Sequence, residues 1–280
     1  MFDQTFNYTE DGRVYMKTYG LDLYSGMDGK TRPAIIVFPG GGYTHQSTSE
    51  AEPVAITWAA RGYSVFVLYY SVMEYAGYPE LLEEAAWSIK TVRDHAEEFH
   101  VDPDCIAVMG FSAGANLASM IGTQWHEPFL AEKYGCESEY LRPNAAVLGY
   151  GVYDIKGRTS SPVDVGRIMA EQDPHASTID FIDERTVPSF ICATRYDEVG
   201  ACRQSLEYAL RMDDFKLPYE IMITNSGVHG LSVNNRVCVR RGRPIDDCFA
   251  RWVDSCDLWL QRTFGEVEWI SPENAGFAFL

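Results

Sequence analysis

The hydrophobic positions of this chain follow two patterns that alternate along its length. Short continuous apolar runs are typical of strands buried on both faces, and apolar residues spaced three and four apart are typical of helices. The continuous runs predict strands at residues 33–38, 64–70, 105–109, 145–150, 187–194 and 219–224. The helical spacing predicts helices at residues 51–61, 80–100, 117–123, 200–215 and 247–263. Before them, residues 13–23 predict early strands with a turn near Gly20.

This alternation predicts an α/β fold, with a mostly parallel central sheet and helices on both of its faces. The 280 residues suit one domain over residues 1–280. Residues 157–186 are polar and irregular, which predicts a small insertion instead of a large lid. The tail at residues 264–280 carries four aromatic side chains. It is expected either to fold back on its own domain or to form a homodimer contact.

The charge balance is strongly acidic, with 23 basic and 40 acidic residues and a net charge of −17. Such a balance argues against nucleic acid and anionic membranes as partners. No apolar run approaches the ~20 residues of a membrane span, and the polar first residues show no signal peptide. We therefore expect a cytoplasmic protein, although a sequence trimmed at its start would look the same. The seven cysteines are scattered without a CxxC, which predicts free thiols and no metal site.

A nucleophile motif follows the strand expected at residues 105–109. The sequence GFSAG at 110–114 is a G-x-S-x-G placed between a strand and a helix. This spacing lets Ser112 project from a sharp turn, because side chains two residues before and after it would collide. The N–H of Ala113 opens the helix and is expected to point at a developing oxyanion. The sequence therefore predicts Ser112 as a nucleophile.

A serine hydroxyl needs a base, and a base needs a group that holds its tautomer. Among the six histidines, only His229 lies late in the chain on a glycine-flanked loop after a strand. Asp197 follows the strand expected at 187–194 and precedes His229, with Glu198 and Asp154 as alternatives. The chain order Ser112, Asp197, His229 matches that of the α/β-hydrolases.

Three consecutive glycines follow the strand at residues 33–38, in the sequence PGGGY at 39–43. Glycine there lets the backbone approach a scissile carbonyl oxygen and adopt φ values closed to other residues. We expect the N–H groups of Gly41 and Gly42 to complete an oxyanion hole with that of Ala113. A nucleotide-binding G-x-G-x-x-G is excluded because His45 stands where the last glycine would be, and GKT at 29–31 is not followed by a helix.

With these residues assembled, the chain resembles the bacterial acetyl-xylan-esterase-like group of the α/β-hydrolase superfamily over residues 33–262. The shared motifs appear as PGGGY (39–43), EAEP (50–53), YYSV (69–72), GFSAG (110–114) and HGL (229–231). There are departures, since Tyr69 replaces an Asn, Ala115–Asn116 replaces a Gly-His pair, and RYDEVG replaces the usual acid loop.

The resemblance implies a serine esterase without metal or cofactor that removes short acyl groups, above all acetyl, from sugars or xylo-oligosaccharides. The rings of Tyr43, Tyr70 and Tyr153, and the imidazole of His45, are candidates for substrate contact. For the three tyrosines, a core or rim role is favoured over substrate contact. Arylformamidase, peptidase or lactone hydrolase activity stays open on the same fold, as does a binding module with a dead site.

Overall fold

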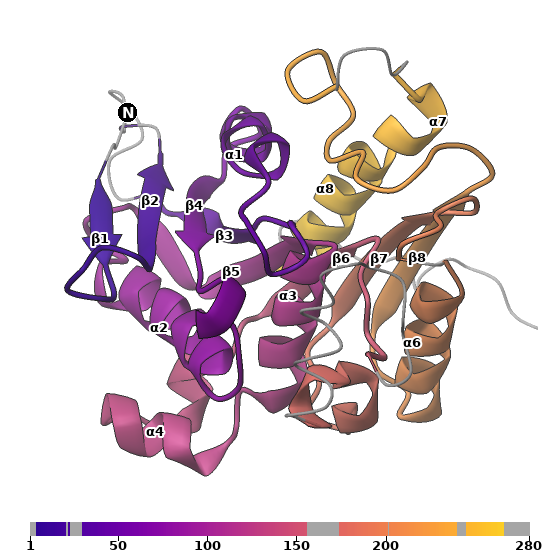
Figure 1. Cartoon of the computed structure of the whole chain (residues 1–280). Helices are drawn as coiled ribbons and strands as arrows, with labels where there is room; N and C mark the ends of the chain where they lie inside the picture. Colours follow the sequence, from indigo (N-terminus) through magenta and orange to yellow (C-terminus); the bar gives the residue numbers. More distant parts are fainter. Residues whose placement is uncertain are drawn as a thin grey trace, which may run out of the picture.

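The computed structural model describes residues 4–20, 22, 30–155, 174–200, 202–239 and 245–265. Within these ranges, eight strands form one sheet with helices on both faces, which confirms the predicted fold class (Figure 1). The strands are β1 (Thr5–Asn7), β2 (Tyr15–Tyr19), β3 (Arg32–Phe38), β4 (Ser64–Tyr69), β5 (Val101–Phe111), β6 (Ala145–Gly149), β7 (Ser189–Thr194) and β8 (Tyr219–Thr224). The α-helices are α1 (Glu52–Ala59), α2 (Glu80–Asp94), α3 (Ala113–Gln124), α4 (Pro128–Tyr134), α6 (Cys202–Asp214), α7 (Asp247–Ala250) and α8 (Trp252–Thr263).

The strands lie in the order β1-β2-β4-β3-β5-β6-β7-β8. The pairs β1–β2 and β2–β4 are antiparallel, and every pair from β4 to β8 is parallel. Parallel strands bring their carboxyl ends to one edge of the sheet, where ligands bind in open α/β folds. The loops after β3, β5, β7 and β8 therefore share one edge.

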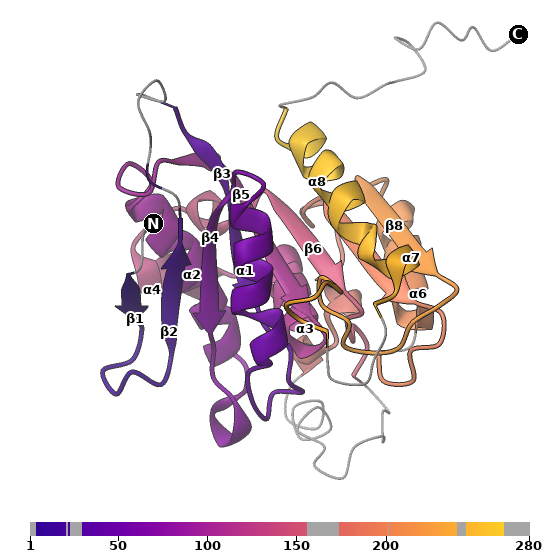
Figure 2. The same cartoon turned by 90° about the horizontal axis from the view of Figure 1, so that it is seen from above.

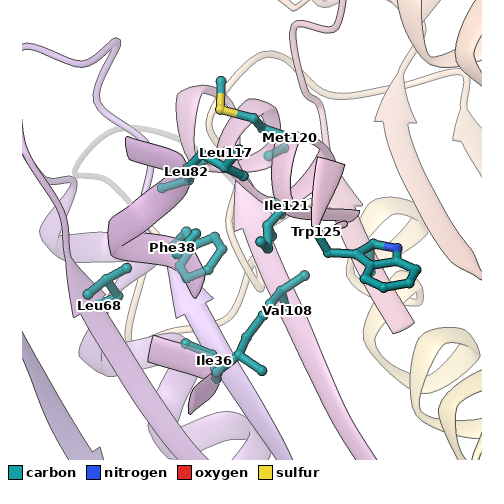
Figure 3. Packing of buried hydrophobic residues seen from close by; sticks show 14 of the residues in the cluster. Ile36, Phe38, Leu68, Leu82, Val108, Leu117, Met120, Ile121 and Trp125 are labelled. Carbon is teal, nitrogen blue, oxygen red and sulfur yellow. The ribbon is translucent and has the colours of Figure 1, made fainter. Parts of the chain in front are cut away.

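Two apolar layers cover the sheet, because successive side chains of a strand point to opposite faces. In β3, Ile36 and Phe38 pack on the side of α2, α3 and α6, and Ile35 and Val37 pack on the side of α1 and α8. Figure 2 shows α1 and α8 on one side of the sheet and α2 and α3 on the other. Figure 3 shows strand residues of the first layer, among them Ile36, against α3. This packing fixes α3, and with it the turn that precedes α3.

Several element boundaries differ from the sequence expectation; β5, for example, spans Val101–Phe111 instead of residues 105–109. A turn lies at residues 9–12, where the N–H of Gly12 donates to the carbonyl of Thr9. The turn expected near Gly20 stays a prediction, because residues 21 and 23–29 lie outside the described ranges. Helix α2 ends at Asp94 rather than at residue 100, because the chain turns back there to enter β5. The helix expected at 247–263 is divided into α7 and α8 at Arg251.

Two expected features lie largely outside the described residues. They are most of the insertion at 157–186 and nearly all of the tail at 264–280. The homodimer contact expected from that tail stays a prediction. No helix within the described ranges combines the length and the apolar content that crossing a bilayer requires.

Candidate active site

Ser112 occupies a sharp turn between β5 and α3, with φ 54° and ψ −116°. The structure shows the steric reason for the glycines two residues before and after Ser112. A Cβ at Gly110 would lie 2.0 Å from the carbonyl oxygen of Gly114, and a Cβ at Gly114 would lie 1.9 Å from that of Phe38. Both distances are far below contact, so only glycine fits. The G-x-S-x-G spacing thus has the strand–turn–helix geometry that a nucleophile elbow requires.

Ser112, His229 and Asp197 form a continuous chain of hydrogen bonds. Nε2 of His229 lies 2.9 Å from Oγ of Ser112, and Nδ1 lies 2.8 Å from Oδ2 of Asp197. The other carboxylate oxygen of Asp197 accepts the N–H groups of Val199 and Gly200 at 2.8 and 2.7 Å. These bonds hold the carboxylate, whose side chain is fully buried. An ionised carboxylate only accepts hydrogen bonds, so Nδ1 of the imidazole carries the proton and Nε2 can accept one from Ser112.

The sheet brings these three residues together although they are distant in sequence. Strands β7 and β8 are parallel and in register at their ends, where Thr194 pairs with Thr224. The loops that carry Asp197 and His229 therefore start side by side. The alternative carboxylates lie elsewhere: Glu198 is exposed, and Asp154 accepts a hydrogen bond from Ser177.

The loop of residues 39–46, called the glycine loop below, lies directly beside the turn that carries Ser112, because Phe38 at the end of β3 pairs with Gly110. The carbonyl of Gly40 accepts the N–H of Ser47 at 2.8 Å, and that of Gly41 accepts the N–H of Thr44 at 3.1 Å. In a trans peptide the C=O and the next N–H point in opposite directions. The N–H groups of Gly41 and Gly42 are therefore turned away from those bonds.

The conformation of the loop explains its glycines. Gly41 has φ 132° and Gly42 has φ 62°, a region that disfavours other residues. A Cβ at Gly41 would also lie 1.9 Å from the carbonyl oxygen of His45. Among the hydrogen bonds of the described residues, none uses the N–H of Gly41, Gly42 or Ala113. Three backbone donors next to Ser112 are thus available to a ligand.

The three candidate tyrosines do not offer a ring face to solvent, so they take the favoured core position and not that of substrate contacts. Tyr43, Tyr70 and Tyr153 are 3%, 2% and 0% exposed. The Tyr43 hydroxyl donates to Oδ1 of Asn116 at 2.7 Å, the Tyr70 hydroxyl donates to the carbonyl of Pro39, and the ring of Tyr153 packs on Tyr208. Burial raises the pKa of each phenol well above its ordinary value. Their position is in the core, the first two as supports of the glycine loop.

His45 lies on the exposed side of the same loop, with Nδ1 3.0 Å from the hydroxyl of Thr44. Its role in substrate contact stays a prediction.

Sequence reasoning missed Asn116 as a structural centre of the site. Its amide donates to the carbonyls of Val152 and Ala176, each at 2.9 Å, while its oxygen accepts from Tyr43. One side chain of α3 thus joins the glycine loop to the segments after β6. The available signal was an Asn within an otherwise small and apolar stretch, GFSAGANLA.

Within the described ranges, no group of three or more His, Cys, Asp or Glu residues is placed to hold a metal ion. All seven cysteines are free thiols, of which four are buried and Cys248 is exposed.

Comparisons with known proteins agree with this architecture. The BD-FAE family model matches residues 21–212, more than half of the chain. Among solved structures, the carboxylesterase Cest-2923 from Lactobacillus plantarum WCFS1 is 26% identical, with a TM-score of 0.81, and the match covers 93% of this chain and 96% of that one. An acetyl ester-xyloside bifunctional hydrolase from Caldicellulosiruptor lactoaceticus is 30% identical, with a TM-score of 0.69, and the match covers 89% of this chain and 87% of that one.

The curated relatives are longer proteins. The acetylxylan esterase of Xylanibacter ruminicola is 29% identical over 158 residues, which cover 56% of this chain and 29% of that protein. The chain spans between 29% and 38% of the length of the first five curated relatives that it matches. Because the family model covers most of the described sheet, up to α6, the assignment rests on the fold and not on one motif. The chain belongs to the BD-FAE family, within the esterase group of the α/β-hydrolases.

Proposed function

We propose that this chain is a serine esterase that hydrolyses short-chain acyl esters through an acyl-enzyme. The observation that carries the proposal is the hydrogen-bonded chain from Ser112 through His229 to the buried carboxylate of Asp197. In this arrangement the imidazole accepts the serine proton while the carboxylate offsets the positive charge that results.

The reaction proceeds in two halves. Oγ of Ser112 attacks the acyl carbon as Nε2 of His229 takes its proton, and the carbonyl oxygen becomes negatively charged. The N–H groups of Gly41, Gly42 and Ala113 stabilise that charge, and one such donor is typically worth ~3–4 kcal/mol in the transition state. His229 then gives its proton to the leaving alcohol. In the second half, water attacks the acyl-enzyme with His229 as base and releases the acid.

The proposed substrate is an acetylated sugar or xylo-oligosaccharide. Two relatives support this choice by their names, since one is an acetylxylan esterase and the other is an acetyl ester-xyloside hydrolase. The tyrosines are buried, so sugar recognition is assigned to exposed residues of the rim, with His45 as the candidate on the glycine loop.

The direct test compares hydrolysis of the p-nitrophenyl esters of acetate, butyrate and octanoate. We expect turnover to fall as the acyl chain lengthens, and faster turnover of octanoate would overturn the short-chain assignment. Ser112→Ala should abolish turnover. Ser119→Ala is the matched control, because Ser119 lies in α3, the helix that follows Ser112, and its hydroxyl is bonded to the Asn116 carbonyl at 2.8 Å and to the Thr178 hydroxyl at 2.7 Å.

A fluorophosphonate probe separates an enzyme from a binding module with a dead site. Labelling of the wild type and none of Ser112→Ala is expected. Equal labelling of both would remove Ser112 from the mechanism. Product analysis with acetylated xylo-oligosaccharides, beside simple acetates and N-formylkynurenine, then identifies the alcohol. Preferential turnover of N-formylkynurenine would replace the esterase by an arylformamidase.

A further inference from the structure

A buried carboxylate lies between the glycine loop and the loop that carries His229. Glu50 ends the short 3-10 helix η1 (Thr48–Glu50) and is 3% exposed. Its Oε2 accepts the N–H of Gly40 at 2.9 Å, and its Oε1 accepts the hydroxyl of Tyr150 at 2.7 Å. The packing is close, since a Cβ at Gly40 would lie 2.5 Å from Oε2. Both carboxylate oxygens are therefore committed to partners that belong to the site.

Tyr150 continues this connection to the histidine loop. Its side chain is fully buried, and its hydroxyl also accepts the N–H of Ser232 at 2.8 Å. Ser232 follows His229 by three residues, and the ring of Tyr150 meets the imidazole edge-on with the ring centres 5.2 Å apart. Burial, with the charge of Glu50 beside it, raises the pKa of Tyr150 well above its ordinary value. The hydroxyl thus stays protonated and donates to Glu50.

The Gly40 peptide is the point at which this network acts on the oxyanion donors. The hydroxyl of Tyr70 holds the carbonyl of Pro39, and Glu50 holds the N–H of Gly40 on the opposite side of the same peptide. The next peptide group carries the N–H of Gly41. In a run of three glycines, little besides such contacts restricts the backbone. Together with the N–H of Ser47, which donates to the carbonyl of Gly40, fixing the first peptide restrains the direction of the donor that follows it.

We propose that Glu50 is a positioning residue that sets the oxyanion donors and the catalytic imidazole in one relative geometry. It acts on the donors through Gly40 and on His229 through Tyr150 and Ser232. The inference rests on the proposed function, because it assigns Glu50 to the site of Ser112. A carboxylate is required in place of an amide because both partners are donors. Glutamine would offer one oxygen and one NH₂ group, and would leave either Gly40 or Tyr150 without its acceptor.

The test measures the rate at which a fluorophosphonate phosphonylates Ser112, since this reaction needs no knowledge of the natural ester. The variants are Glu50→Gln, Tyr150→Phe and both together. Tyr208→Phe is the matched control, because it too removes a hydroxyl from a fully buried tyrosine, and that hydroxyl takes no part in the hydrogen bonds of Glu50 and Tyr150. Circular dichroism and thermal melting report the fold of each variant.

We expect Glu50→Gln and Tyr150→Phe each to slow phosphonylation about 10- to 100-fold, less than the 10²–10³-fold that follows complete loss of one oxyanion donor. With p-nitrophenyl acetate, kcat should fall by a similar factor while KM changes little. The double variant should be slower than wild type by less than the product of the two single effects, because both changes remove the same hydrogen bond. Tyr208→Phe should stay within about twofold of wild type.

The outcomes separate this inference from the proposed function. Folded Glu50→Gln protein that reacts at the wild-type rate overturns the positioning role, and so does a lower melting temperature without a change in rate. If Glu50→Gln does not fold, Tyr150→Phe decides by the same criterion. A wild type that is labelled at Ser112 but hydrolyses no ester refutes the esterase and leaves Glu50 to be judged by the labelling rates. A wild type that is not labelled at all overturns both.

Discussion

Glu84 should make the folded protein less stable as the pH rises from acidic to neutral. This residue of α2 is 2% exposed, and its carboxyl accepts the N–H and the hydroxyl of Ser71 at 2.8 and 2.6 Å. Burial outweighs these two bonds and raises its pKa from 4.5 to about 7. At pH values between 4.5 and about 7, Glu84 has released its proton in the unfolded chain but keeps it in the folded chain. The folded state then binds more protons, so the free energy of unfolding falls as the pH increases.

The size of the effect follows from the same values. At about 1.4 kcal/mol for each pH unit, a pKa raised from 4.5 to about 7 corresponds to about 3 kcal/mol. The contribution is fully present below pH 4.5 and is lost as the pH passes 7. Part of it is offset if the buried site relaxes when the group ionises, so about 3 kcal/mol is the upper end.

The assay compares urea unfolding of the wild type and Glu84→Gln, followed by tryptophan fluorescence at pH values from 4.5 to 8. Every other titrating group is present in both proteins, so the difference between the two curves isolates Glu84. We expect the wild type to lose up to about 3 kcal/mol relative to the variant across this range. Parallel curves for the two proteins would refute a raised pKa at this site.

Three further predictions concern the active site and its support. Asp197→Asn should lower kcat by about 10⁴ with little change in melting temperature, because the imidazole loses the acceptor that selects its tautomer; a decrease below tenfold would contradict this role. Gly114→Ala should give an unstable or insoluble protein, since its Cβ would lie 1.9 Å from the Phe38 carbonyl oxygen. Gly122→Ala in the same helix is the control: its Cβ would lie 3.3 Å from a side-chain methyl group, and this variant should have a melting temperature near that of the wild type. Asn116→Ala removes the three hydrogen bonds of a buried side chain and should lower the free energy of unfolding in urea by about 2–4 kcal/mol; wild-type stability would contradict it.

Much of the fold could be predicted because the apolar pattern records burial directly. β3, β4 and β6 differ from their expected bounds by one residue, since a strand covered on both faces must be apolar throughout. The edge strand β8 is only half-buried and still has the expected bounds. The boundaries that failed depend on other forces. The end of α2 and the break between α7 and α8 are set by where the chain must turn to reach its next contact, and helical spacing continues past both points. Short segments such as α4 were missed because seven residues carry too little periodicity.

The residues of the candidate site also fall into a predictable and an unpredictable group. Those whose role depends on neighbours in the sequence could be predicted, and those whose partners are distant in the sequence could not. Gly110 and Gly41 are required by backbone only four residues away in the chain, and this local spacing is visible in the sequence. Gly114 belongs to the same motif, although the carbonyl that excludes its Cβ is that of Phe38 on another strand. The residues that hold this geometry are joined across long stretches of chain: 31 residues separate Tyr70 from Pro39, 73 separate Tyr43 from Asn116, and 100 separate Glu50 from Tyr150. Nothing in a single sequence ties such pairs together. The glycines and the residues that support them nevertheless depend on each other. Glycine lets the loop backbone come close to Ser112, but it also leaves that backbone free to adopt many conformations. Buried polar contacts from the core are then needed to hold the loop in one conformation. A triad recognised by motif therefore predicts that such supports exist, while their identity emerges only from the packed structure.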